Sequence, residues 1–135
     1  MNNKITGMLI LAVAILFLTA CGSDKITGKI TFEIDDKTIK DGQSTTLKIN
    51  AKNTGTVAGD MIFKIIPEDP KKLIITYDGS LESNLQPGED TGTKILKVQG
   101  FTDYTSTEYT ITTQLIRKSD NKILDEKIVR ITVKK

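Results

Sequence analysis

The sequence contains 135 residues, with 19 lysines and arginines against 17 aspartates and glutamates, no histidine, one cysteine, four phenylalanines, three tyrosines and no tryptophan. The formal net charge is only +2, so the chain lacks the basic excess and interleaved aromatic residues typical of nucleic-acid-binding proteins. Without histidine or a second cysteine, the common zinc sites and the Ser-His-Asp and Cys-His catalytic arrangements are excluded. We therefore expect a protein that is not an enzyme, binds no nucleic acid and needs no cofactor.

The N-terminal region has the pattern of a secretory signal. Lys4 provides a positive charge, Met8–Leu18 is an unbroken run of eleven apolar residues, and Thr19 and Ala20 are the small residues that a signal peptidase accepts. As a helix, this run measures about 16 Å, little more than half of the ~30 Å hydrocarbon core of a bilayer. The pattern predicts a hydrophobic signal helix rather than a full membrane span.

The sole cysteine, Cys21, follows this segment directly. The sequence Leu-Thr-Ala-Cys at Leu18–Cys21 resembles the lipobox of prokaryotic lipoproteins. The resemblance implies cleavage before Cys21, a diacylglycerol on its sulfur, and attachment to the cell membrane on the extracytoplasmic side. The chain then divides into a lipoprotein signal peptide (1–20), a short tether carrying the lipidated cysteine (21–24) and a folded domain (25–135).

Two other interpretations of Cys21 are open from the residues alone. The thiol could be buried and inert within a transmembrane anchor. Alternatively, the chain could be a pilin-like protein in which a peptidase cuts before the apolar run and keeps Ile5–Ala20 as a short filament helix.

From Lys25 onward, apolar residues alternate with polar ones, as in half-buried antiparallel strands. Turn signals separate these runs; Pro87-Gly88, for example, has the pattern of a type II turn, in which Gly88 adopts a positive φ. Strands are predicted at 29–34, 46–53, 61–66, 73–77, 94–98, 108–116 and 127–133. Seven short strands in about 110 residues predict an all-β fold, an immunoglobulin-like antiparallel β-sandwich.

Three stretches carry a second resemblance. The segments "IKDGQSTTLKINAKNTGTVAGDMIFKI", "LQPGEDTGTKILKV" and "EYTITTQL" are similar to the CARDB and related extracellular immunoglobulin-like modules of bacteria and archaea, over Thr38–Val133. The resemblance implies a non-catalytic adhesion, assembly or spacer module at the cell surface. Modules of this family usually occur in several copies within larger proteins, whereas this chain carries one.

Acidic residues in the predicted loops provide the only candidates for catalysis. Two carboxylates can run glycoside hydrolysis, and the candidates are Glu68, Asp69, Glu89 and Asp90. Each lies in a predicted loop beside proline or glycine, where adjacent carboxylates are usually plain solvated charge. A small carboxylate-dependent hydrolase is therefore an alternative that the sequence does not favour.

A second acidic group, Asp35, Asp36 and Asp41, surrounds a predicted turn. Loop carboxylates of this kind bind calcium in some extracellular sandwiches, but the spacing is not that of an EF-hand. We regard the group as a weak calcium candidate, because acidic residues at strand ends commonly serve solubility alone.

Binding through a loop or a sheet edge is the remaining mechanism. The longer predicted loops are 53–60, 78–92 and 100–106, and the last contains Phe101 and Tyr104, aromatic residues of the type found at binding hot spots. These two side chains could instead plug one end of the core. We expect an envelope protein partner for a lipid-anchored binding, adhesion or assembly domain. A carbohydrate- or small-ligand-binding domain is the alternative, and the scarcity of aromatic residues speaks against it.

Overall fold

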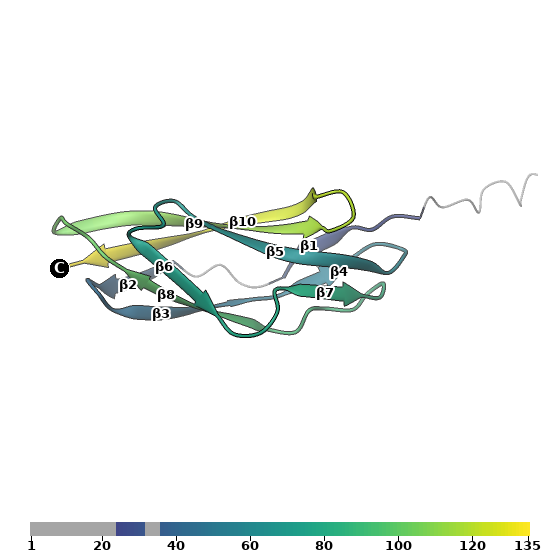
Figure 1. The fold of residues 1–135 in the computed structure, drawn as a ribbon, viewed down its shortest axis with the longest axis horizontal. Coiled ribbons are helices and arrows are strands. Elements are labelled where there is room, and N and C mark those ends of the chain that lie inside the picture. Colours follow the sequence, from purple (N-terminus) through teal and green to yellow (C-terminus); the bar gives the residue numbers. More distant parts are fainter. Residues whose placement is uncertain (1–23, 32–35) are drawn as a thin grey trace, which may run out of the picture.

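The computed structural model describes residues 24–31 and 36–135, and all regular structure in these residues is β-strand (Figure 1). The strands are β1 (Gly28–Ile30), β2 (Lys37–Lys40), β3 (Ser44–Ile49), β4 (Ala51–Asn53), β5 (Gly59–Pro67), β6 (Leu73–Tyr77), β7 (Glu82–Leu85), β8 (Lys94–Gly100), β9 (Ser106–Arg117) and β10 (Lys122–Lys134). Within this described part of the chain, no helix is long and apolar enough to cross a membrane. The predicted signal helix, the lipobox and Cys21 lie outside the described residues.

Two sheets face each other and enclose the core, so the expected β-sandwich is confirmed (Figure 1). The larger sheet has the order β2-β10-β9-β5-β7, the smaller has β3-β8-β6, and β1 pairs with β4 beside them. One pairing departs from the antiparallel expectation, because β2 runs parallel to β10, with Thr38 opposite Thr132. Alternation along a strand reports which face is buried, but it contains no information about the direction of the neighbouring strand.

The structure contains more strands than the seven predicted. The single strand expected at 46–53 is divided at Asn50 into β3, which pairs with β8, and β4, which pairs with β1. Part of the predicted loop 78–92 forms β7, which pairs with β5, and β2 was not predicted. Strands β2, β4 and β7 have three or four residues each, too few for a periodic pattern to distinguish them from a loop.

The period-two pattern correctly predicted the core face of the longest strands. In β9 the side chains of Tyr109, Ile111, Thr113 and Leu115 are all buried, and in β10 those of Val129, Ile131 and Val133 are buried. Burying an aliphatic side chain of this size stabilises the fold by roughly 1.5–3 kcal/mol relative to leaving it in water. The long β9–β10 hairpin is therefore a central part of the core.

A polar residue, Asn53, occupies one fully buried position at the end of β4. Its side-chain Nδ2 donates hydrogen bonds to the carbonyl oxygens of Val57 and Leu85, both at 2.9 Å, and its Oδ1 accepts one from the Gly55 N–H at 2.8 Å. Its backbone bonds to Gly88 and Glu89 in the turn that follows β7. Asn53 thus joins β4, the loop after it, β7 and the next turn.

The loop after β4 also holds the first described residues of the chain. The N–H groups of Thr54 and Thr56 donate to the carbonyl oxygens of Thr27 and Lys25, at 3.0 and 2.9 Å. A β-carbon at Gly55 would lie 2.1 Å from the Lys25 carbonyl oxygen, so this close approach of two backbones requires glycine. The chain therefore enters the domain through a segment that is fixed to the sandwich.

The N-terminal segment and the C-terminus lie at opposite ends of the sandwich (Figure 1). The first described residues emerge beside the β9–β10 turn, and the guanidinium of Arg117 at that turn donates to the Ile26 carbonyl oxygen at 3.4 Å. The C-terminus lies at the opposite end, where Lys135 N–H donates to the Thr105 carbonyl oxygen at 3.1 Å. The twelve residues of β9 separate these ends by about 35 Å at the usual rise of a strand.

Replacing Asn53 with alanine should lower the free energy of unfolding by roughly 3 kcal/mol, because three buried or part-buried backbone groups lose their partner. Urea denaturation of the full chain measures this change. The matched control is Asn84→Ala, because Asn84 is exposed and, among the described residues, its side chain bonds only to Asp60. This change should stay within about 0.5 kcal/mol. Equal effects of the two substitutions would show that the buried carboxamide is not the stabilising feature.

Candidate functional site

The loop that joins β8 to β9, residues 101–105, forms part of the end of the sandwich that carries the C-terminus (Figure 1). We refer to residues 101–105 as the tip loop. It follows Gly100, the last residue of β8, and the Phe101 N–H donates to the Lys72 carbonyl oxygen at 2.8 Å. Loops fixed on a rigid scaffold are the usual location of binding residues.

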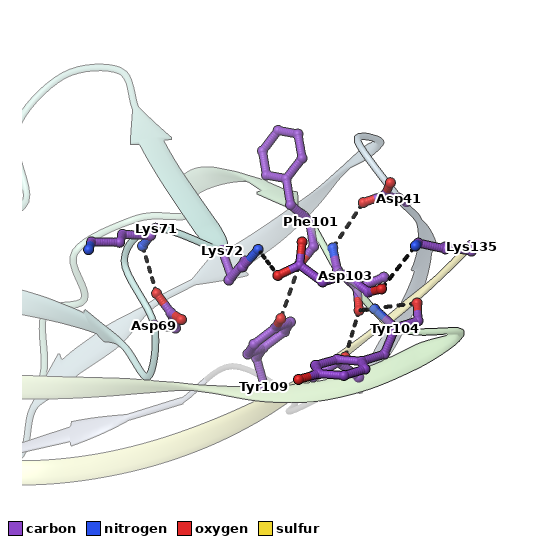
Figure 2. Close-up of polar contacts among 11 residues, drawn as sticks. Asp41, Asp69, Lys71, Lys72, Phe101, Asp103, Tyr104, Tyr109 and Lys135 are labelled. Atoms are coloured by element: carbon purple, nitrogen blue, oxygen red, sulfur yellow. Dashed lines mark hydrogen bonds and ion pairs between the residues drawn. The ribbon is translucent and has the colours of Figure 1, made fainter.

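The tip loop is held in place by hydrogen bonds from three directions (Figure 2). The Thr102 N–H donates to Asp41 Oδ1 at 2.9 Å, and the Tyr109 hydroxyl donates to the Phe101 carbonyl oxygen at 3.1 Å. The buried Thr102 hydroxyl is 2.6 Å from that of Thr107 and accepts from the Tyr104 N–H at 3.1 Å. Because its backbone is fixed in this way, the loop presents its exposed side chains in one arrangement.

The structure places Phe101 and Tyr104 on the same loop, but their rings point in different directions (Figure 2). Phe101 is half-buried, and its ring lies near the β2–β3 turn, where a β-carbon at Gly42 would be 3.9 Å from it. Tyr104 is 72% exposed, among the most exposed large side chains described. A core-plugging role is therefore wrong for Tyr104, whereas Phe101 partly covers the end of the sandwich. Tyr104 is the aromatic group that a partner could contact.

Asp103, which precedes Tyr104 in the tip loop, contacts two lysines. Lys72 Nζ donates to the Asp103 carboxylate at 2.6 Å, and Lys135 Nζ donates to the Asp103 carbonyl oxygen at 2.9 Å (Figure 2). The hydrogen bond from Lys72 holds the pKa of Asp103 below its usual value of 3.8, and the same bond raises the pKa of Lys72. An exposed tyrosine next to a charged, hydrogen-bonded pair is suited to noncovalent contact with a protein surface.

The four loop carboxylates considered for hydrolysis are not brought together. Glu68 accepts from the Thr110 N–H and hydroxyl at 2.8 and 2.9 Å, and Asp69 accepts from the Lys71 N–H at 2.8 Å. Glu89 accepts from the Gln86 N–H, and Asp90 from the Gly92 N–H, both at 2.8 Å in the turn beside β4. Each carboxylate bonds to backbone close to its own strand or turn, so the two pairs share no site.

The calcium candidates are also occupied with other contacts. Asp41 binds the tip loop, as described above, and Asp36 accepts from the Arg130 N–H at 3.0 Å. Asp35 lies outside the described residues. In residues 24–31 and 36–135, no group of three or more metal-binding side chains is close enough to hold an ion.

Sequence reasoning identified the two aromatic residues of the tip loop but missed Lys72, Asp103 and Thr102. Lys72 and Asp103 are 31 positions apart in the sequence, and only the pairing of β6 with β8 brings them together. No local pattern in the sequence signals such a contact.

Comparisons with known proteins identify the fold but no family. No protein-family model matches the sequence, and no curated protein matches it. Escherichia coli alpha-2-macroglobulin in its native conformation superposes with a TM-score of 0.58 and 13% identity, covering 81% of this chain and 6% of that protein. A fragment of the same protein from domain MG7 to its C-terminus gives 0.54 and 15%, covering 82% of this chain and 17% of the fragment. A family 123 glycoside hydrolase from Clostridium perfringens gives 0.55 and 7%, covering 76% and 23%.

This chain adopts an immunoglobulin-like β-sandwich fold. It spans less than a quarter of the length of each of these proteins, and each is under 25% identical. The likeness therefore concerns one domain and its fold, because one fold supports many unrelated functions.

Acid should loosen the tip loop only below the pH range of most environments. A carboxyl group whose pKa is lowered by folding stabilises the folded state when the pH is above its ordinary pKa, which is 3.8 for Asp103. This contribution disappears as the pH falls through the lowered pKa.

Substituting Lys72 by glutamine should move the pKa of Asp103 back up toward 3.8. An NMR titration of the Asp103 carboxyl carbon measures this shift, with Lys71→Gln as the control. An unchanged pKa in Lys72→Gln would contradict the assigned cause.

Proposed function

We propose that this chain is a lipid-anchored cell-envelope protein whose immunoglobulin-like domain acts by binding, adhesion or assembly, without catalysis. The resemblance of Leu18–Cys21 to a lipobox supports attachment through a diacylglycerol on Cys21, with the domain on the extracytoplasmic side of the membrane. The similarity to CARDB-like modules supports a binding or assembly role, and an envelope protein is the expected partner.

The observation that carries the proposal is that the N-terminal segment and the tip loop lie at opposite ends of the domain. The segment that follows the tether, Lys25–Thr27, is fixed at one end by Thr54 and Thr56. The tip loop, with the exposed Tyr104, lies at the other end (Figure 1). A domain attached through its N-terminus therefore holds the tip loop away from the attachment point, where a partner can reach it.

The two alternative functions, carbohydrate or small-ligand binding and carboxylate-dependent hydrolysis, receive less support from the arrangement of side chains. A carbohydrate-binding surface usually needs a platform of neighbouring aromatic rings, but the exposed Tyr104 lies in the tip loop and the exposed Tyr77 lies opposite Leu96, at the far end of β6. A carboxylate hydrolase needs two carboxyl groups across one substrate, and the loop pairs lie apart. Binding through the tip loop remains the function that the geometry supports best.

Replacing Cys21 with serine should abolish lipidation, because an alcohol does not provide the thiolate nucleophile that accepts the diacylglycerol. We expect the variant protein to leave the membrane fraction or to retain its uncleaved N-terminus. Membrane fractionation and mass spectrometry of the N-terminal peptide measure the two outcomes. Normal processing and full membrane retention of Cys21→Ser would disprove the lipid anchor.

Crosslinking in living cells tests the binding role. The native protein is recovered through a C-terminal tag and compared by mass spectrometry with a membrane-bound control that lacks residues 25–135. We expect one protein to be enriched in stoichiometric amounts, and Tyr104→Ala to reduce its recovery roughly tenfold, as for loss of an aromatic hot spot. The matched control is Ile123→Ala, which removes an exposed apolar side chain at the other end of the domain. Absence of any enriched protein would contradict a protein-binding role.

A further inference from the structure

One edge of the smaller sheet lacks the protection that the other sheet edges show. Exposed edge strands usually carry charges or proline, because their unpaired backbone groups otherwise pair with other chains. Edge strand β7 holds Glu82 in an ion pair with Lys118, β2 contains two lysines, and β3 contains Lys48. The remaining edge of the two larger sheets, β6, has the sequence Leu-Ile-Ile-Thr-Tyr, with neither a charge nor a proline.

The register of β6 shows which of its backbone groups are free. The Phe101 N–H donates to the Lys72 carbonyl oxygen, so the facing pair Leu73 and Gly100 is one that exchanges no hydrogen bonds. In an antiparallel ladder the bonded and non-bonded pairs alternate; the bonds to β8 therefore come from Ile74 and Thr76. The N–H groups of Ile75 and Tyr77 point away from β8, toward the open edge.

Apolar side chains are exposed along this edge and on the neighbouring strand. Ile74 is 45% exposed, Tyr77 50% and Ile95 of β8 54%. Beside them lies a hollow of about 470 Å³, whose lining residues are Thr76, Tyr77, Asp78, Thr93, Lys94, Ile95 and Lys97. An extended segment lying along β6 could insert a side chain into this hollow.

Basic residues outnumber acidic ones around the hollow, whose lining contains Lys94 and Lys97 against the single carboxylate of Asp78. Within residues 24–31 and 36–135, no ion pair involves Lys48, Lys94 or Lys97. Lys97 lies directly opposite Thr76, one strand away from the open edge, and Lys94 lines the hollow. On the outer face of the larger sheet, in contrast, Arg130 lies between two carboxylates, with its nitrogens 3.7 Å from Asp36 and 3.6 Å from Glu108.

We infer that β6 is the docking edge for an extended, acidic segment of a partner protein, which adds to the smaller sheet as a further strand. Backbone hydrogen bonds to Ile75 and Tyr77 provide the binding, and carboxylates of the segment meet Lys94 and Lys97. This inference rests on the proposed binding function, but it assigns a surface other than the tip loop. A second copy of this chain fits less well, because the same lysines would then approach one another.

The test places a photoreactive amino acid, p-benzoylphenylalanine, in the full chain in its native membrane, at Thr76, at Tyr104 or at Thr112. Thr112 is the matched control on β9, in the larger sheet. We expect the probe at Thr76 to form an adduct with an acidic, extended segment of a protein, and the probe at Thr112 to form no such adduct. The crosslinked peptide is identified by mass spectrometry.

Two pairs of variants then separate the contributions of the backbone and of the charge. Tyr77→Pro removes the free N–H without breaking a bond to β8, and should lower the adduct yield roughly fivefold; Tyr77→Ala keeps the N–H and is its control. Lys97→Glu should lower the yield by a similar factor, whereas Lys64→Glu, the same change on the outer face of the larger sheet, should not. The Lys97 pair keeps the test decisive if the proline variant unfolds.

The outcomes distinguish this inference from the function on which it rests. Equal adduct yields from Tyr77→Pro and Tyr77→Ala would overturn strand addition. An adduct at Thr76 with lipid or with a second copy of this chain would also overturn it. So would an adduct yield at Thr76 that is no higher than the yield at Thr112. An adduct at Tyr104 alone would overturn the docking edge and leave the binding function in place. Adducts at neither position would contradict both.

Discussion

The buried side chain of Asn53 is the interaction on which the arrangement of this domain depends. It satisfies three backbone groups in two segments, at Gly55, Val57 and Leu85. A buried amide that makes all its hydrogen bonds is stabilising and specific, whereas the same groups without partners would each cost free energy. Asn53 therefore gives the loop after β4 a single conformation, and that loop in turn fixes the segment through which the chain enters the domain.

This constraint relates the fold to the proposed function. The loop after β4 binds Lys25 and Thr27 at one end of the sandwich, and the β9–β10 hairpin connects this end to the tip loop at the other (Figure 1). Because both ends are fixed by hydrogen bonds, the N-terminal segment and the tip loop keep their positions at opposite ends of the domain. The open edge of β6 lies along the side of the sandwich, so the proposed edge partner and a partner at the tip loop would contact different surfaces.

The sequence predicted those features whose signals are local. Alternation identified the buried face of β9 from Tyr109 to Leu115, and the Pro87-Gly88 pair predicted a turn in which Gly88 indeed has a φ of 82°. The parallel pairing of β2, the short strand β7 and the contact between Lys72 and Asp103 were not predicted, because each depends on segments far apart in the sequence. Asn53 was predicted to lie where the strand 46–53 passes into the loop 53–60, but its burial depends on the packing of β7 against β5.

The central claim is that the domain is attached at one end and presents its tip loop at the other. Because Cys21 is the only cysteine, a thiol introduced by Tyr104→Cys or by Ser119→Cys would, in the lipidated protein, be the single free thiol. The measurement is the quenching of a fluorophore at each position by a quencher attached to lipid headgroups, with the full chain in its membrane. The account predicts stronger quenching at position 119, in the β9–β10 turn, than at position 104. Equal quenching, or stronger quenching at position 104, would contradict it.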